Sequence, residues 1–210
     1  MKILNLYSGI GGNRKNWDSV RDDLEITAVE NVPEIAEVYK KFFPNDTVIV
    51  ADAHDYLLHH FKEFDFIWTS PPCPSHSRLR KVVSMSAGSK AVYPDMKLYE
   101  EILLLQGYFK GKYVVENVRS WYKPLIEPQE VQRHYFWTNF NIPEKKFERD
   151  CIKTTGRFAP GVTLADTIDV LQKKHGFDLG DICNSKKRLY LRNCVNPEVG
   201  KHILEASLTN

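Results

Sequence analysis

Short apolar segments alternate with helix-like stretches along the first 120 residues, and this alternation most limits the possible fold. The apolar segments are rich in β-branched or aromatic residues and end at polar or turn residues; they span 2–7, 25–30, 47–51, 64–69 and 112–116. Apolar residues recur at helical spacing between them, near 13–23, 33–43, 54–62 and 95–107. This order predicts an α/β fold, with a mostly parallel sheet and helices on both faces.

The remaining residues give a weaker pattern. Residues 134–140 predict a strand and 197–208 a helix, whereas 141–185 show no clear period. The chain has 210 residues, the size of one domain, and its 42% apolar and 27% charged content is typical of a globular protein. No apolar run approaches the ~20 residues that cross a bilayer, and none resembles a signal peptide. We therefore expect an intracellular, cytoplasmic protein without a membrane segment.

The four cysteines are widely scattered and show no pairwise spacing typical of a zinc site; they are Cys73, Cys151, Cys183 and Cys194. We expect no metal and, in a reducing compartment, free thiols.

The first three predicted strands each end in a residue type that suits a nucleotide-like ligand. The first runs into the glycine-rich turn at residues 7–12, a generic phosphate or nucleotide cradle that is also found as a plain turn. The second ends at Glu30, about 20 residues later, where a carboxylate can bind ribose hydroxyls. The third ends at Asp52, which can accept a hydrogen bond from an adenine amino group. Because strand ends of a parallel sheet share one edge, the three together favour an adenosyl ligand.

The fourth and fifth predicted strands end in reactive groups. Cys73 lies among three prolines in the loop at residues 69–75, and a thiol held in a stiff loop after a strand favours a nucleophile over a core residue. Glu116 ends the fifth strand, where burial raises a carboxyl pKa and lets the group hold a proton. The alternative for Glu116 is an incidental carboxylate beside a helix cap at Asn117.

Taken in order, these motifs resemble those of the cytosine-C5 DNA methyltransferases. The matching segments are residues 6–12, 28–31, Asp52, 70–77, 114–118, 133–140 and 192–204. The Pro-Cys and Glu-Asn-Val pair, 43 positions apart (116 − 73), carries most of the specificity. The resemblance implies a Rossmann-like, S-adenosylmethionine-dependent methyltransferase fold with S-adenosyl-L-methionine as cofactor.

Cofactor contacts follow from the resemblance by position. Glu30 would hold the ribose, Asp52 the adenine amino group, and Val32 would cover the adenine in place of Asn31. The implied cofactor-binding set is Tyr7, Ser8, Gly9, Ile10, Gly11, Gly12, Glu30, Asn31, Val32, Asp52, Ala53, Pro72, Asn193 and Val195.

The resemblance also implies a catalytic set of Cys73, Glu116 and Arg133. Cys73 would attack C6 of a cytosine flipped out of the duplex, and Glu116 would bind N3 and the exocyclic amine. The implied substrate contacts are Pro72, Ser75, Arg78, Arg80, Asn117, Val118, Gln132, His134, Lys186, Lys187 and Arg188. Where the family usually has two arginines, this chain has Gln132 and His134 with Arg133 between them, so which of the three faces the base stays open.

The chain departs from the family in size. We expect a catalytic core at 1–140, a reduced target-recognition and connecting region at 141–191, and a C-terminal segment at 192–210 that returns to the core. Residues 141–210 carry 12 Lys and Arg against 9 Asp and Glu, so this part provides basic groups that can neutralise phosphates. So compact an enzyme would suit a phage or its bacterial host.

The leading interpretation is a monomeric DNA cytosine-C5 methyltransferase, with a possible protein partner that aids recognition. An RNA cytosine-C5 methyltransferase would carry the same motifs. An amino-methyltransferase of DNA needs an aromatic residue at the position of Cys73, and a catalytically weak binding relic would not need Cys73 and Glu116.

Overall fold

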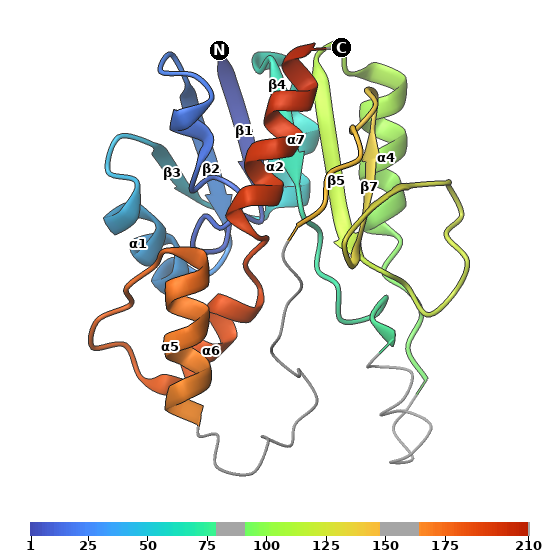
Figure 1. Cartoon of the computed structure of the whole chain (residues 1–210). Helices are drawn as coiled ribbons and strands as arrows, with labels where there is room; N and C mark the ends of the chain where they lie inside the picture. Colours follow the sequence, from blue (N-terminus) through green and yellow to red (C-terminus); the bar gives the residue numbers. More distant parts are fainter. Residues whose placement is uncertain (79–90, 148–163, 210) are drawn as a thin grey trace.

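A computed structural model describes residues 1–78, 91–147 and 164–209. A seven-stranded sheet runs through the protein in the order β3-β2-β1-β4-β5-β7-β6 (Figure 1). Strands β1 to β5 pair in parallel, and β7 runs antiparallel to both β5 and β6. The strands are β1 (Lys2–Leu6), β2 (Glu25–Glu30), β3 (Thr47–Val50), β4 (Phe66–Thr69), β5 (Lys112–Val118), β6 (Gln129–Val131) and β7 (His134–Thr138).

Helices cover both faces of this sheet. They are α1 (Pro33–Phe42), α2 (Ala53–His60), α4 (Lys97–Tyr108), α5 (Leu164–His175), α6 (Asn184–Arg192) and α7 (Pro197–Thr209), with single 3₁₀ turns η1 (Trp17–Ser19) and η2 (Phe61–Glu63). Leu4 and Leu6 of β1 pack on the face of α2 and α4, whereas Ile3 packs on the face of η1 and α7. Since both faces of β1 are buried, its run of apolar residues is explained. The predicted α/β fold, with a mostly parallel sheet and helices on both faces, is confirmed.

The segment expected as a helix at 13–23 contains only η1. Tertiary contacts hold it instead: the Trp17 indole N–H donates to the carbonyl of Gly200 (3.2 Å), and the Arg14 guanidinium binds the Asp46 carboxylate through two hydrogen bonds (2.9 and 3.1 Å). Both side chains are buried, so packing outweighs the helical spacing of the sequence.

Helix α5 forms within the region that showed no clear period, and α6 begins at its end. Ile168 and Leu171 of α5 and Leu191 of α6 join a buried cluster with Val38 of α1 and Ile10 of the glycine-rich turn. In the parts of 141–191 that the structure describes, the chain forms helices and irregular segments rather than strands. This helical pair therefore packs directly beside the first strand end.

Two further findings apply to the described residues alone. None of their helices is long and apolar enough to span a membrane. They also contain no group of three or more His, Cys, Asp or Glu residues placed to hold a metal ion.

Candidate active site

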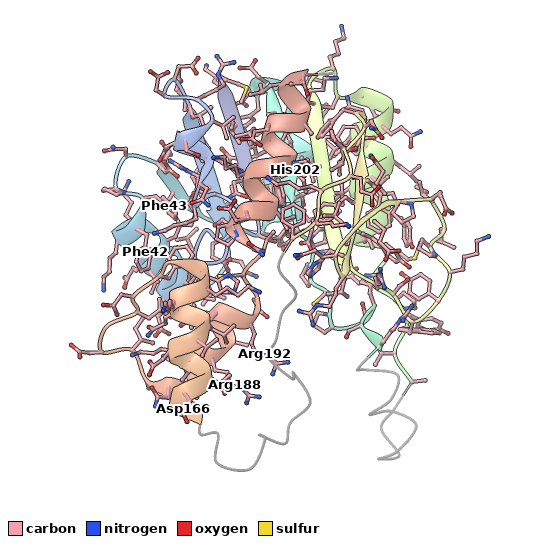
Figure 2. The ribbon with its side chains drawn as sticks, in the orientation of Figure 1. Phe42, Phe43, Asp166, Arg188, Arg192 and His202 are labelled. Carbon is pink, nitrogen blue, oxygen red and sulfur yellow. The ribbon has the colours of Figure 1, made fainter. Side chains whose placement is uncertain are left out.

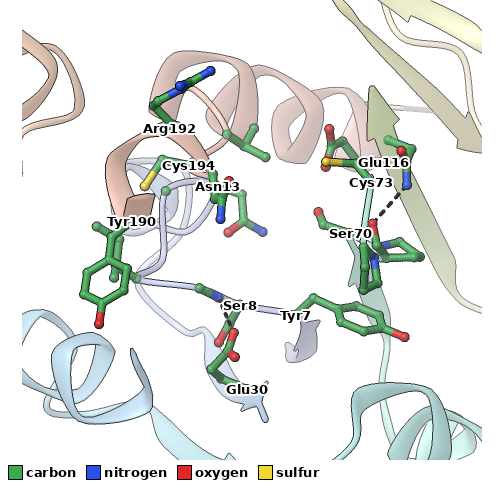
Figure 3. A pocket seen from close by; sticks show the side chains of 18 of the residues that line it. Tyr7, Ser8, Asn13, Glu30, Ser70, Cys73, Glu116, Tyr190, Arg192 and Cys194 are labelled. Atoms are coloured by element: carbon green, nitrogen blue, oxygen red, sulfur yellow. Dashed lines mark hydrogen bonds between the residues drawn. The ribbon is translucent and has the colours of Figure 1, made fainter. Parts of the chain in front are cut away.

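A pocket of about 360 Å³ lies at the carboxyl ends of the parallel strands (Figure 3). Its walls come from the segments after β1, β2 and β4, from the end of β5, from the start of β7, and from residues between 190 and 195 around the end of α6. Of the expected cofactor set, it gathers Tyr7, Ser8, Gly9, Ile10, Gly12, Glu30, Asn31, Pro72, Asn193 and Val195. Of the expected catalytic and substrate set, it gathers Cys73, Glu116, Asn117, Val118 and His134.

The glycine-rich turn is shaped by close contacts on two sides. A Cβ atom at Gly11, whose φ is +86°, would lie 2.3 Å from the Phe43 ring, and one at Gly12 would lie 2.6 Å from the carbonyl oxygen of Val195. Only glycine allows these approaches. The turn therefore lies tightly between α1 and the C-terminal segment, which brings Gly12 and Val195 to the same pocket wall.

Glu30 holds this turn from the end of β2. One carboxylate oxygen accepts the backbone N–H of Gly9 (3.0 Å) and the other that of Val32 (3.0 Å), and only 8% of the residue is exposed. Beside it, the buried hydroxyl of Ser8 lines the pocket and has no hydrogen-bond partner among the described residues. Since an unpaired buried hydroxyl is costly, this part of the pocket fits a polar ligand.

The cysteine loop is fixed by its own backbone and by β5. The carbonyl of Cys73 accepts the backbone N–H groups of His76 and Ser77 (3.0 Å each), which close a tight turn. The side-chain amide of Asn117 donates to the carbonyl of Pro71 (2.9 Å), the bond drawn near Cys73 in Figure 3. These bonds hold the thiol and the Glu116 carboxyl in one pocket.

Burial raises the pKa of the Cys73 thiol, and the nearby charge of Glu116 raises it further. Both effects disfavour a thiolate, so the protein without ligands holds Cys73 chiefly as a neutral thiol. A nucleophilic role therefore requires that the Cys73 thiol lose its proton before or during the attack.

Of the three residues at the late strand motif, the structure brings His134 into the pocket. Its Nε2 atom lies 3.8 Å from Oε1 of Glu116. Arg133 is exposed and lies outside the pocket wall, and Gln132 occupies the turn between β6 and β7 with φ +55°. His134 is thus the member of this set that is placed to touch a ligand beside Glu116.

Four expected cofactor residues lie away from the pocket wall. Asp52 caps α2 by accepting the backbone N–H of Asp55 (3.0 Å), and Ala53 is buried behind it. Val32 is 41% exposed at the start of α1, and Gly11 faces that helix.

Several expected substrate contacts also lie outside it. The Ser75 hydroxyl accepts the backbone N–H of Asp95 (3.0 Å), and the Arg78 side chain donates to the carbonyl of Ser120 (3.3 Å). Lys186 pairs with Glu34 (2.6 Å), and Lys187 and Arg188 lie on α6 beyond the pocket. Arg80 lies outside the described residues.

Further pocket residues were not among the expected site residues: Asn13, Ile35, Ser70, Pro71, Pro74, Tyr190, Arg192 and Cys194. Arg192 and Cys194 directly flank Asn193 in the C-terminal motif, so their position in the sequence could have indicated them. Tyr190 is only 6% exposed and also forms part of the wall.

The matches to known proteins agree with this geometry. A family model described as C-5 cytosine-specific DNA methylase matches residues 1–125. The tRNA (cytosine(38)-C(5))-methyltransferase of Rattus norvegicus is 33% identical over 82 residues, which cover 38% of this chain and 21% of that protein. The Spodoptera frugiperda enzyme of the same name is 36% identical over 80 residues, covering 37% and 24%. The chain thus aligns with only about a fifth to a quarter of the length of these relatives.

A structural comparison supports the fold over the whole chain. The solved structure of the Entamoeba histolytica methyltransferase EhMeth aligns over 99% of this chain and 98% of its own, with a TM-score of 0.59 and 13% identity. The family match spans the glycine-rich turn, Glu30, Cys73 and Glu116, all of which line one pocket. The chain belongs to the C-5 cytosine-specific DNA methylase family, whose cofactor is S-adenosylmethionine.

Proposed function

We propose that this protein transfers a methyl group from S-adenosylmethionine to C5 of a cytosine in DNA, through a covalent adduct on Cys73. The observation that carries the proposal is the single pocket that joins the glycine-rich turn to both Cys73 and Glu116. One part of this pocket offers hydrogen-bonding groups for a cofactor, and the other offers a thiol and a carboxyl for a base.

The residues present fit the cofactor. The unpaired Ser8 hydroxyl and the backbone of residues 8–12 would hold it, with Glu30 at the ribose and Asn193 and Val195 closing the site. When bound, S-adenosylmethionine supplies the electrophilic methyl group that C5 of the base takes.

Cys73 and Glu116 would make C5 nucleophilic. The Cys73 thiolate would add to C6 while Glu116, protonated when the base binds, passes that proton to N3, so that the C5–C6 π electrons make C5 nucleophilic. After C5 has taken the methyl group, loss of its proton to water, return of the N3 proton to Glu116 and departure of the thiolate would restore the aromatic base and the enzyme. Because the charge of Glu116 contributes to the raised pKa of Cys73, a proton shared between Glu116 and N3 would also favour the thiolate.

The target base would have to leave a duplex to reach Cys73, so we propose base flipping. His134 would contact the flipped base beside Glu116 in place of Arg133. Residues 141–191 would supply a small recognition region, in which the described helices α5 and α6 carry basic side chains.

RNA is a second candidate substrate. The observation that favours it is that both curated relatives named above are tRNA methyltransferases. The same pocket chemistry would serve either nucleic acid, since Cys73 and Glu116 contact only the base.

The deciding experiment offers the protein labelled S-adenosylmethionine with DNA or RNA that contains 5-fluorocytosine. Fluorine at C5 blocks the final elimination, so a C5 methyltransferase remains covalently attached through its thiol. We expect a stable complex with DNA that is lost in Cys73→Ala and kept in Cys183→Ala, which removes an exposed thiol outside the pocket.

A complex with RNA alone would assign the second substrate. Cofactor binding without trapping or methyl transfer on either nucleic acid would overturn the proposed activity and favour a binding protein.

A further inference from the structure

Helix α6 carries four cationic side chains, which differ in whether their charge is paired within the protein. The Lys186 ammonium lies 2.6 and 2.8 Å from the two carboxylate oxygens of Glu34, so its charge is already paired. The side chains of Lys187, Arg188 and Arg192 form no hydrogen bond or ion pair within the described ranges. Two guanidinium groups on α6 are therefore available to an anion from outside the protein.

The two arginines lie on one face of the helix. They are four residues apart, so they project in similar directions about 6 Å apart along the helix axis. Figure 2 shows both side chains extending from α6 away from the body of the sheet. Together they form a short row of positive charge, which we call the α6 arginine row.

One end of this row reaches the candidate active site. Arg192 is exposed, yet it also lines the pocket that contains Cys73 and Glu116, so it lies at the pocket mouth. Arg188 does not line the pocket and continues the row away from it. The row thus leads from the surface of α6 to the rim of the pocket.

The acidic residues of the pocket do not neutralise Arg192. Both carboxylate oxygens of Glu30 accept backbone N–H groups, and Glu116 faces His134. An unpaired guanidinium binds phosphate well, because its planar N–H groups form two parallel, charge-assisted hydrogen bonds.

We infer that the α6 arginine row binds the sugar-phosphate backbone beside the target nucleotide, with Arg192 at the phosphate nearest the flipped base. The inference rests on the proposed function and names the group that holds the nucleic acid at that site. A line of two cations matches a polyanion, whereas the single carboxylate of a cofactor inside the pocket could reach only Arg192.

The test measures how salt weakens nucleic-acid binding. The variants are Arg192→Gln, Arg188→Gln and the double variant, each titrated against a fluorescein-labelled, cytosine-containing DNA duplex and an RNA hairpin between 50 and 200 mM KCl. Each lost phosphate contact reduces the slope of log K against log salt by about 0.9 on duplex DNA. A change of this size in the slope corresponds to roughly fivefold weaker binding than that of the wild-type protein near 0.15 M salt, for each single variant.

Lys41→Gln is the matched control. Lys41 is an exposed cation in the last turn of α1 and does not line the pocket, so its removal should leave the slope unchanged. Thermal melting of each variant checks that the fold is retained.

Two results would overturn the inference. One is an unchanged salt slope in both single variants. The other is weaker S-adenosylmethionine binding by Arg192→Gln with unchanged nucleic-acid binding, which would assign Arg192 to the cofactor carboxylate.

Failure of the proposed function would look different. The wild-type protein would then bind nucleic acid with the expected slope, and the variants would reduce it, but no methyl group would be transferred. If the wild-type protein transferred methyl groups and the variants kept unaltered salt slopes, the proposed function would stand. Only the inferred role of the α6 arginine row would then be refuted.

Discussion

Replacing the buried carboxylate of Glu101 tests how the floor of the pocket is held. Glu101, on α4, is fully buried and accepts hydrogen bonds from the hydroxyls of Tyr7 (2.6 Å) and Thr69 (2.5 Å) and lies 3.0 Å from Nδ1 of His54. Tyr7 starts the glycine-rich turn with φ +53°, a strained value for a non-glycine residue. The carboxylate therefore ties together the ends of β1 and β4 and helps to keep Tyr7 in this conformation.

The change is Glu101→Gln, which preserves shape and removes the charge. A hydrogen bond to a charged group contributes about 1.5–3 kcal/mol and one between neutral groups about 0.5–1.5 kcal/mol, so each of the three contacts weakens by roughly 1 kcal/mol. Burying an amide costs less than burying a carboxylate, which offsets part of this loss. We expect the free energy of unfolding to fall by about 2 kcal/mol, or the melting temperature by about 4–8 °C for a chain of this size.

The loss should depend on pH because of His54. Its hydrogen bond to Glu101 raises the pKa of His54 above the usual 6.5, against the opposing effect of partial burial. A group whose pKa is raised on folding stabilises the protein fully below its unfolded pKa, and this contribution disappears as the pH rises through the folded pKa. The difference between wild type and Glu101→Gln should therefore be larger at pH 5.5 than at pH 9.

The assay is urea denaturation followed by circular dichroism at both pH values. Glu100→Gln is the matched control, because Glu100 is the neighbouring residue on α4 and its exposed side chain lies 3.2 Å from the other nitrogen of His54. A surface pair of this kind contributes at most about 1 kcal/mol. If Glu101→Gln lost no more than this control, or lost equally at both pH values, the reasoning about the buried carboxylate would be refuted.

Three further predictions concern the pocket. Gly12→Ala should weaken S-adenosylmethionine binding at least about tenfold by calorimetry, which corresponds to ~1.4 kcal/mol or more. The added Cβ atom would lie 2.6 Å from the carbonyl oxygen of Val195 and would push that segment of the pocket wall away. Unchanged affinity would show that the two segments separate freely. Glu30→Ala should raise the Kd for the cofactor more than it slows transfer at saturating cofactor, since Glu30 holds the backbone N–H of Gly9; a pure rate defect would contradict the ribose role. Because the pKa of Cys73 is raised and only its thiolate reacts, single-turnover transfer should accelerate as pH rises above 7, and a flat profile would argue against a neutral resting thiol.

The sequence predicted the pocket residues that follow directly from strand ends. The alternation of strands and helices places the glycine-rich turn, Glu30, Cys73 and Glu116 after β1, β2, β4 and β5, and parallel strands bring these ends to one edge. No tertiary information is needed for this step, because each residue is adjacent to a short apolar run whose direction is set by the fold class.

The choice among Gln132, Arg133 and His134 needed the structure. Side chains alternate along β7, so a shift of one residue would exchange the residue that faces the pocket. The turn at Gln132 fixes the register in which His134 pairs with Val118 of β5, and this places His134 on the same face as Glu116. The sequence alone gives the alternation of side chains along the strand. It does not give the residue at which the turn ends and the strand begins.

The pocket wall around residues 190–195 could be predicted only in part. The sequence indicated the Asn-Val motif, but it did not indicate the packing contacts that hold this segment in place. Tyr190 and Leu191 join the buried cluster of α1 and α5, and the side-chain amide of Asn16 donates to Glu198 at the start of α7 (2.7 Å). The Asn16–Glu198 hydrogen bond joins residues 182 positions apart, so no local periodicity can report it. Because the turn at Gly12 lies against Val195, the C-terminal helices set the position of the first strand end. The chain therefore builds the candidate pocket from both ends of its sequence, although the family match covers only residues 1–125.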